Sequence, residues 1–157
     1  EGWADLGSYA GYPVSQAQLQ DYHDYNAGEY HDWHVSYVDQ INTAEPDANV
    51  QLIPVASTLA GLFTSGPLAG MTLDDLYVDS APHGTETVYF LASMVTYQSV
   101  FGEAPPANFD VPDMIHPSVA ENFDAIALQI DAALGGYETG DGVIDINAHR
   151  IARSIKV

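Results

Sequence analysis

The sequence predicts an α/β fold that is rich in helix and has few strands. Residues 29–44 repeat apolar and aromatic side chains at the spacing of one helix face, and residues 85–101 and 117–134 are long and apolar enough for further helices. Only residues 49–55 combine a short apolar run, β-branched side chains and flanking turn residues, a pattern typical of a buried strand. One strand among several helices is therefore the expected architecture.

The first 44 residues are expected to form a loop followed by two helices. Three glycines and a proline predict a loop over residues 1–14. Ser15 is a suitable N-cap for a short helix to Tyr25, and Gly28 separates that helix from the next. The expected buried face of the second helix consists of Tyr30, Trp33, Tyr37, Val38 and Ile41.

The middle of the chain contains the predicted strand, from Asn49 to Val55. A lone strand leaves its backbone N–H and C=O groups unpaired, so it needs neighbouring strands. The sequence shows none, which indicates that this chain works as part of something larger. A helical turn or two over residues 57–63 is expected next, before the Ser-Gly-Pro stretch at 65–67.

Two long helices are predicted in the second half. Residues 85–101 are apolar almost all round, which predicts a buried helix that ends at Gly102. Pro117 suits the first position of the other helix. Its expected apolar face consists of Val119, Phe123, Ile126, Ile130 and Leu134. The chain is thus divided into a main unit, residues 1–135, and a small tail, residues 136–157.

Charge and composition exclude several classes of function. The chain has 22 acidic and 3 basic residues, and the basic ones are Arg150, Arg153 and Lys156. Such a surface repels nucleic acid and anionic lipid. It suits a salty or calcium-rich extracellular medium, either as a generally acidic secreted protein or as one that depends on a specific cation. No apolar run reaches the roughly 18–20 residues of a membrane span, and the absence of Cys excludes disulfides and thiol nucleophiles.

A carboxylate and an imidazole precede the third predicted helix. Asp79 lies four residues before His83. This is the acid–base part of a hydrolytic triad, in which the carboxylate orients the histidine and the histidine acts as general base. The alternative is that His83 is merely a polar residue at the start of a helix, with Gly84 and Thr85 supplying the turn and the cap.

Three segments resemble the C-terminal half of SGNH (GDSL-type) hydrolases. They are "EGWADL" at residues 1–6, "EYHDWHVSYVDQINTAEPDANVQLIPV" at 29–55 and "DDLYVDSAPHGTETVYFLASMVTYQSVFGEAPP" at 74–106. The resemblance covers roughly residues 1–130. It implies the helix-rich half of a flavodoxin-like three-layer fold, with His83 as general base and Asp79 as its partner. The family usually separates the two by two residues, whereas three intervene here.

The nucleophile expected from this resemblance is missing from the chain. Neither the family's Gly-Asp-Ser block nor its oxyanion Gly and Asn are present, and no Gly-x-Ser-x-Gly occurs. Ser80 shares a tight loop with His83, while Ser8, Ser57 and Ser65 lack acid–base neighbours in sequence. An upstream half or a second chain is therefore expected to supply the serine. The resemblance implies a carbohydrate-ester or lipid-ester hydrolase, inactive as this chain alone and without a required cofactor.

Two regions are candidates for metal binding. His31 and His34 are close enough on one helix to share a metal, which His23, Asp24 or Asp32 could complete; the alternative is a solvated aromatic helix. The tail "GDGVIDINAHRIARSI" resembles half of a dockerin or EF-hand calcium loop. There Asp141 and Asp145 would be Ca²⁺ ligands at positions five and nine. The residues at positions one, three and twelve, namely Tyr137, Thr139 and Ala148, lack carboxylates, which makes this loop degenerate.

A second class of function is an alternative interpretation of these patterns. The chain could be a non-catalytic extracellular module, derived from the same fold, that binds a partner or assembles with copies of itself. An unpaired strand edge favours such pairing. The three cations of the tail would share one side of a short helix and could dock on the acidic body or on a neighbouring copy.

Overall fold

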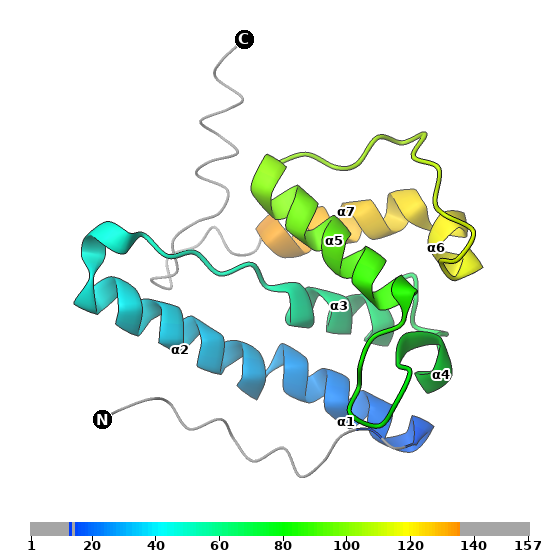
Figure 1. Cartoon of the computed structure of the whole chain (residues 1–157), viewed down its shortest axis with the longest axis horizontal. Helices are drawn as coiled ribbons and strands as arrows, with labels where there is room; N and C mark the ends of the chain where they lie inside the picture. The colour runs from blue at the N-terminus through cyan, green and yellow to red at the C-terminus, as the bar shows by residue number, and fades with distance from the viewer. Residues whose placement is uncertain (1–12, 14, 136–157) are drawn as a thin grey trace.

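The computed structural model describes residues 13 and 15–135, and this part of the chain is built almost entirely of helices (Figure 1). The helices are, in chain order, α1 (Gln16–Ala27), α2 (Glu29–Ala44), the 3₁₀ turn η1 (Pro46–Ala48), α3 (Val55–Thr64), α4 (Leu73–Leu76), α5 (Glu86–Phe101), α6 (Pro117–Glu121) and α7 (Phe123–Gly135). The prediction of a helix-rich chain is confirmed.

Helices α1 and α2 follow one another as a long rod (Figure 1). Backbone hydrogen bonds continue through the junction, because the Gly28 N–H donates to Asp24 and the Gly28 carbonyl accepts from Asp32, both at 2.9 Å. A Cβ at Gly28 would lie 3.1 Å from the Asp24 carbonyl oxygen. Glycine therefore fits the close approach to the Asp24 carbonyl at the junction of the two helices.

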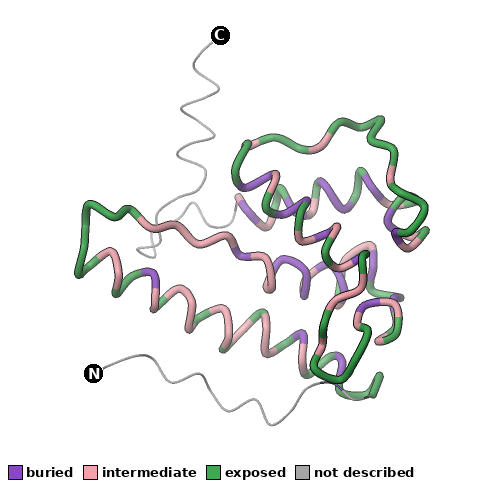
Figure 2. The backbone as a smooth tube through the Cα atoms, viewed as in Figure 1, coloured by how far each residue is buried: buried purple, intermediate pink, exposed green. Residues whose placement is uncertain are grey.

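Helix α3 lies at the centre and contacts α1, α5 and α7. The fully buried side chains come mainly from α3, α5 and α7, and include Leu62, Leu91, Val95, Ile126 and Ile130. Figure 2 shows the same distribution, with buried stretches on these helices and mostly intermediate or exposed residues along α2. Each such side chain contributes about 1.5–3 kcal/mol through removal from water. Because α3 contacts α1, α5 and α7, the core is centred on this helix.

The predicted strand at 49–55 is wrong for this structure. Residues 49–54 form no regular element, and Val55 instead begins α3. The Asn42 side chain takes the place of a neighbouring strand: its Oδ1 accepts from the Val50 N–H at 2.8 Å, and its Nδ2 donates to the Val50 carbonyl at 2.9 Å. A strand needs a lateral partner, and within the described residues the bridge between Tyr77 and Gly84 is the β pairing that occurs.

The predicted helix at 117–134 is divided in two at Asn122. Pro117 is at its expected first position, behind a His116 cap. Both the backbone N–H and the side-chain amide of Asn122 donate to the Ser118 carbonyl, at 3.2 and 2.8 Å. Asparagine side chains compete in this way with regular helical bonding. The chain then restarts as α7.

Helix α5 has the predicted position but is only partly buried. Leu91 and Val95 are fully buried, whereas Tyr89 is 60% and Val100 is 51% exposed. The nearly uniform apolar composition predicted burial all round, but the described helices cover only one side. Within the described part, no helix has the length and apolar character needed to cross a membrane.

Candidate active site

The loop between α4 and α5 is closed at its base by two backbone hydrogen bonds. The Val78 N–H donates to the His83 carbonyl, and the Thr85 N–H donates to the Leu76 carbonyl, both at 2.9 Å. At Gly84 a Cβ would lie 2.9 Å from the Val88 side chain, so a larger residue would push the loop away from α5. The loop therefore presents His83 from a fixed base just before a packed helix.

Asp79 uses its two carboxylate oxygens for different purposes. Oδ2 lies 2.6 Å from His83 Nδ1, whereas Oδ1 accepts from the backbone N–H groups of Ala81 at 2.9 Å and His83 at 3.3 Å. One oxygen thus shapes the turn while the other orients the imidazole. The contact expected from the sequence is present, although three residues separate the pair. The catalytic role of Asp79 and His83 stays a prediction.

The hydrogen bond also determines where His83 carries its proton. A carboxylate only accepts hydrogen bonds, so Nδ1 must be the protonated nitrogen of the neutral ring and Nε2 must carry the lone pair. The hydrogen bond to His83 lowers the pKa of Asp79, which keeps the carboxylate ionised. The His83 side chain is 64% exposed. This arrangement suits a general base whose free nitrogen is accessible to a second group.

His83 borders a pocket of about 330 Å³. Pro82, His83 and Gly84 form one side, and Tyr77 and residues of α1, α3 and α5 form the rest. Most of these side chains are apolar or aromatic. A concave apolar space beside an oriented imidazole is the usual form of a small-molecule site.

His23, which the sequence indicates only as a candidate metal ligand, lines this pocket. It is 3% exposed, and its Nε2 has no hydrogen-bond partner in the described structure. Burial lowers the pKa of His23 to about 4, although neighbouring Asp24 acts in the opposite direction. Its ring lies 5.4 Å from that of Phe63. Its spacing of four residues from buried Leu19 was the available signal that it faces inward.

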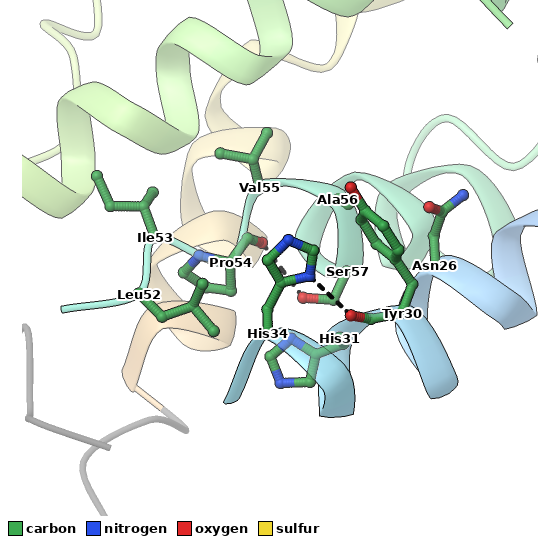
Figure 3. Close-up of a pocket in the computed structure, with 10 residues that line it drawn as sticks. All are labelled: Asn26, Tyr30, His31, His34, Leu52, Ile53, Pro54, Val55, Ala56 and Ser57. Carbon is green, nitrogen blue, oxygen red and sulfur yellow. Dashed lines mark hydrogen bonds between the residues drawn. The ribbon is translucent and has the colours of Figure 1, made fainter. Parts of the chain in front are cut away.

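The three-ligand metal site around His31 and His34 is not formed. Among the described residues no three His, Asp or Glu side chains gather in a way that could hold a metal ion. His31 and His34 instead line a separate pocket of about 200 Å³ with the 52–57 segment (Figure 3). His34 Nδ1 lies 2.8 Å from the Tyr30 carbonyl oxygen. His23 lines the pocket beside His83 and therefore lies apart from His31 and His34.

No serine hydroxyl of the described residues forms a hydrogen bond with His83. Ser80 is exposed beside Asp79. Ser57 lines the pocket of His31 and His34, a proximity that the sequence did not indicate, but its Oγ donates to the Pro54 carbonyl at 3.2 Å (Figure 3). The described residues thus contain a base and its orienting acid without a paired nucleophile.

A second carboxylate–imidazole pair has a structural explanation. His116 Nε2 lies 3.7 Å from Asp75 Oδ1, too far for a hydrogen bond. Asp75 Oδ2 accepts from the backbone and hydroxyl of Thr72, at 2.8 and 2.7 Å, and these bonds lower the pKa of Asp75. Both residues therefore serve as caps, of α4 and α6.

Asp141 and Asp145, the candidate Ca²⁺ ligands, lie outside the described residues, and calcium binding by the tail stays a prediction. Comparisons of this chain with models of protein families, with curated proteins and with solved structures find no match. The chemistry of the site is therefore inferred from the residues and their geometry.

Proposed function

We propose that this chain supplies the Asp79–His83 pair of an SGNH-type hydrolase that cleaves carbohydrate or lipid esters. The observation that supports the proposal is the 2.6 Å contact between Asp79 and His83 Nδ1, which leaves Nε2 available at the edge of a pocket. The acidic composition, with its net charge of −19, favours an extracellular setting for this enzyme.

The proposed reaction is acyl transfer to a serine outside residues 1–157. His83 Nε2 removes the hydroxyl proton while the serine oxygen attacks the ester carbonyl carbon. Asp79 stabilises the resulting imidazolium, and backbone N–H groups near the serine stabilise the oxyanion. His83 then returns the proton to the leaving alcohol. His83 then removes a proton from a water molecule, which hydrolyses the acyl-enzyme, and the proton returns to the serine so that the serine and His83 are restored.

The proposal includes a fold of which this chain is the C-terminal half. In a three-layer fold, residues 50–53 would be a strand of the central sheet. Within the described structure Gln51 and Leu52 form no backbone hydrogen bonds, which supports a missing lateral partner. The exposed side of α5, with Tyr89 and Val100, would likewise be covered. An upstream half or a second chain would provide both this layer and the serine.

A fluorophosphonate probe, which reacts with activated serines, tests this proposal on the native polypeptide. We expect one labelled serine outside residues 1–157, and loss of labelling in His83→Ala. Labelling of Ser57 or Ser80, or labelling that persists in His83→Ala, would contradict it. As a companion assay, the 157-residue chain alone should hydrolyse p-nitrophenyl acetate no faster than free imidazole at equal histidine concentration.

A second candidate function is a non-catalytic extracellular module that binds a partner or self-assembles. The observation that favours it is the exposure of large apolar side chains: Val78 is 64%, Met114 is 72% and Leu128 is 72% exposed. Such side chains, when contiguous, often mark interaction surfaces. Sedimentation of the chain over a range of concentrations tests it, and a monomer without serine labelling in the native polypeptide would leave neither function supported.

A further inference from the structure

The walls of the pocket beside His83 are mostly apolar or aromatic. Helix α1 contributes Tyr22 and His23, α3 contributes Leu59 and Phe63, and α5 contributes Val88 and Ala92. Asn26 also lines it, but its side-chain amide already donates to the Tyr22 carbonyl at 2.9 Å. A ligand in this space would meet mainly methyl groups and aromatic rings. Transfer of apolar surface from water would therefore supply most of its binding energy.

The volume of the pocket limits the size of its ligand. At about 330 Å³ it is roughly twice the size of an apolar cavity of about 150 Å³ that holds one benzene molecule. A linear chain of medium length would fill it, whereas a long lipid chain or an oligosaccharide would be too large to fit. The pocket is thus suited to one end of a substrate.

The interior of the pocket disfavours ionic ligands of both signs, for different reasons. Residues 1–149 contain no Lys or Arg, so no fixed cation is present in the pocket wall for an anionic ligand. His23 reports on the opposite sign. Burial there outweighs the attraction of Asp24 and lowers the pKa of the ring to about 4, so this part of the pocket disfavours a positive charge as well.

We infer that this pocket binds the uncharged, medium-length acyl group of the ester substrate, and that His83 meets the ester bond at the edge of the pocket. The inference rests on the proposed hydrolase function. It assigns Leu59, Phe63 and Ala92 to acyl recognition, and it predicts that the alcohol part of the substrate extends away from these helices. The class of substrate is an ester of a medium-chain, unsubstituted carboxylic acid.

The test uses three ligands that share a six-carbon chain but differ in charge. Methyl hexanoate is neutral, hexanoate is anionic and hexyltrimethylammonium is cationic. In ¹H–¹⁵N NMR titrations of the 157-residue chain, we expect methyl hexanoate to shift signals around Leu59 and Ala92. Both ions should bind at least about tenfold more weakly, because a charge that enters the pocket loses its hydration. Equal or tighter binding of either ion would overturn the inference.

Substitutions that fill the pocket provide the second arm. Ala92→Phe on α5 and Ala56→Phe on α3 place a ring in the pocket from two sides. Each should abolish methyl hexanoate binding, while Ala125→Phe, at an exposed position of α7, should leave it unchanged. Circular dichroism melts identify a variant that fails to fold, and the other variant then carries the test. Unchanged binding in a folded Ala92→Phe or Ala56→Phe chain would also overturn the inference.

The inference and the proposed function can fail separately. Asp79→Asn should remove serine labelling in the native polypeptide but leave methyl hexanoate binding intact, because Asp79 does not line the pocket. Absence of binding together with normal labelling would refute the acyl pocket and leave the hydrolase proposal standing. Binding of methyl hexanoate without any labelled serine would support the pocket as a binding site and refute the hydrolase proposal.

Discussion

Asp79 shows how one side chain can both build a loop and orient a base. Its Oδ1 accepts two backbone N–H groups within the turn, and its Oδ2 accepts from the imidazole. The turn accommodates the three residues that separate Asp79 from His83. Because the backbone bonds fix the carboxylate, His83 is oriented although the pair is largely exposed.

Replacement of Asp79 should change the tautomer of His83. In the wild-type chain the carboxylate requires a proton on Nδ1. In Asp79→Asn the amide can present either its oxygen or its NH₂ group, so this requirement is lost and the Nε2–H form should gain population. Long-range ¹H–¹⁵N correlation spectra of the neutral ring measure the two forms directly. Asp74→Asn, at an exposed position of α4, is the matched control and should leave the tautomer unchanged. An unaltered Nδ1–H form in Asp79→Asn would show that another group orients the ring.

His23 should make the stability of the protein depend on pH between about 6.5 and about 4. Its pKa is lowered from 6.5 to about 4 by burial, so within this range the unfolded chain binds a proton that the folded chain does not. Stability is therefore fully present above 6.5 and falls as the pH decreases, by about 3 kcal/mol in total. Urea unfolding at several pH values measures this slope.

The slope should nearly disappear in His23→Phe, which keeps an aromatic ring but cannot be protonated. His34→Phe, which leaves His23 in place, should retain it. Asp75 and Asp79 do not confuse the measurement: the pKa of each is lowered from 3.8, so their contributions are lost only at still lower pH. A wild-type slope that survives in His23→Phe would rule out His23 as its source.

At the scale of elements, the segment before α3 shows what replaces a strand that has no neighbour. Asn42, on α2, binds both backbone groups of Val50 and so imitates the pairing that a second strand would give at one residue. Gln51 and Leu52 beyond it lack backbone hydrogen bonds within the described structure. The segment is therefore held at Val50 and at the start of α3.

Asn42→Ala should detach this segment from α2. The change leaves the Val50 N–H and carbonyl without their partners, and two hydrogen bonds of this kind contribute about 1–2 kcal/mol to the free energy of unfolding. Asn42→Asp keeps the acceptor but loses the donor, so its effect should be intermediate. Denaturant unfolding gives the values, and hydrogen exchange of the Val50 amide gives the local effect. Asn108→Ala, at an exposed turn, should change the free energy by less than about 0.5 kcal/mol. An equally small effect of Asn42→Ala would argue against the clamp.

At the scale of the whole molecule, charge is the dominant feature. All 22 acidic residues precede the first basic residue, Arg150. The described helices thus carry acidic groups without Lys or Arg among them. Among the described residues, carboxylates instead contact histidines, as between Asp79 and His83 and between Asp75 and His116. Like charges repel across the surface, and this repulsion opposes the compact state.

Salt should therefore stabilise the protein. Between about 0.01 and about 1 M NaCl the screening length falls from about 30 Å to about 3 Å, which removes most of the repulsion between exposed charges. We expect the melting temperature to rise by roughly 3–8 °C over this range. A variant with Lys at the exposed positions Asp21, Asp39 and Asp124 should melt higher at low salt and respond less to NaCl. A melting temperature that is insensitive to NaCl in the wild-type chain would contradict the role given to charge repulsion.

The sequence by itself determined helices α2 and α5, the net charge and the Asp79–His83 pair. Helix boundaries at α2 and α5 follow from local signals, namely side-chain period, glycine and proline. The pair could be found for the same reason, since both residues belong to one short loop whose geometry depends on nearby atoms. The break at Asn122 is local too, but a side chain that donates to the Ser118 carbonyl one turn earlier leaves no mark in the apolar period.

Only the tertiary structure decided which surfaces meet. The fate of residues 49–54 depended on whether a lateral partner was present, and the sequence of the segment itself carries no information about that partner. The inward position of His23 beside Phe63 and the pocket edge formed by His83 likewise depend on how α1, α3 and α5 pack. Local patterns fix local structure, whereas burial and pocket formation arise from contacts between residues that are distant in the chain.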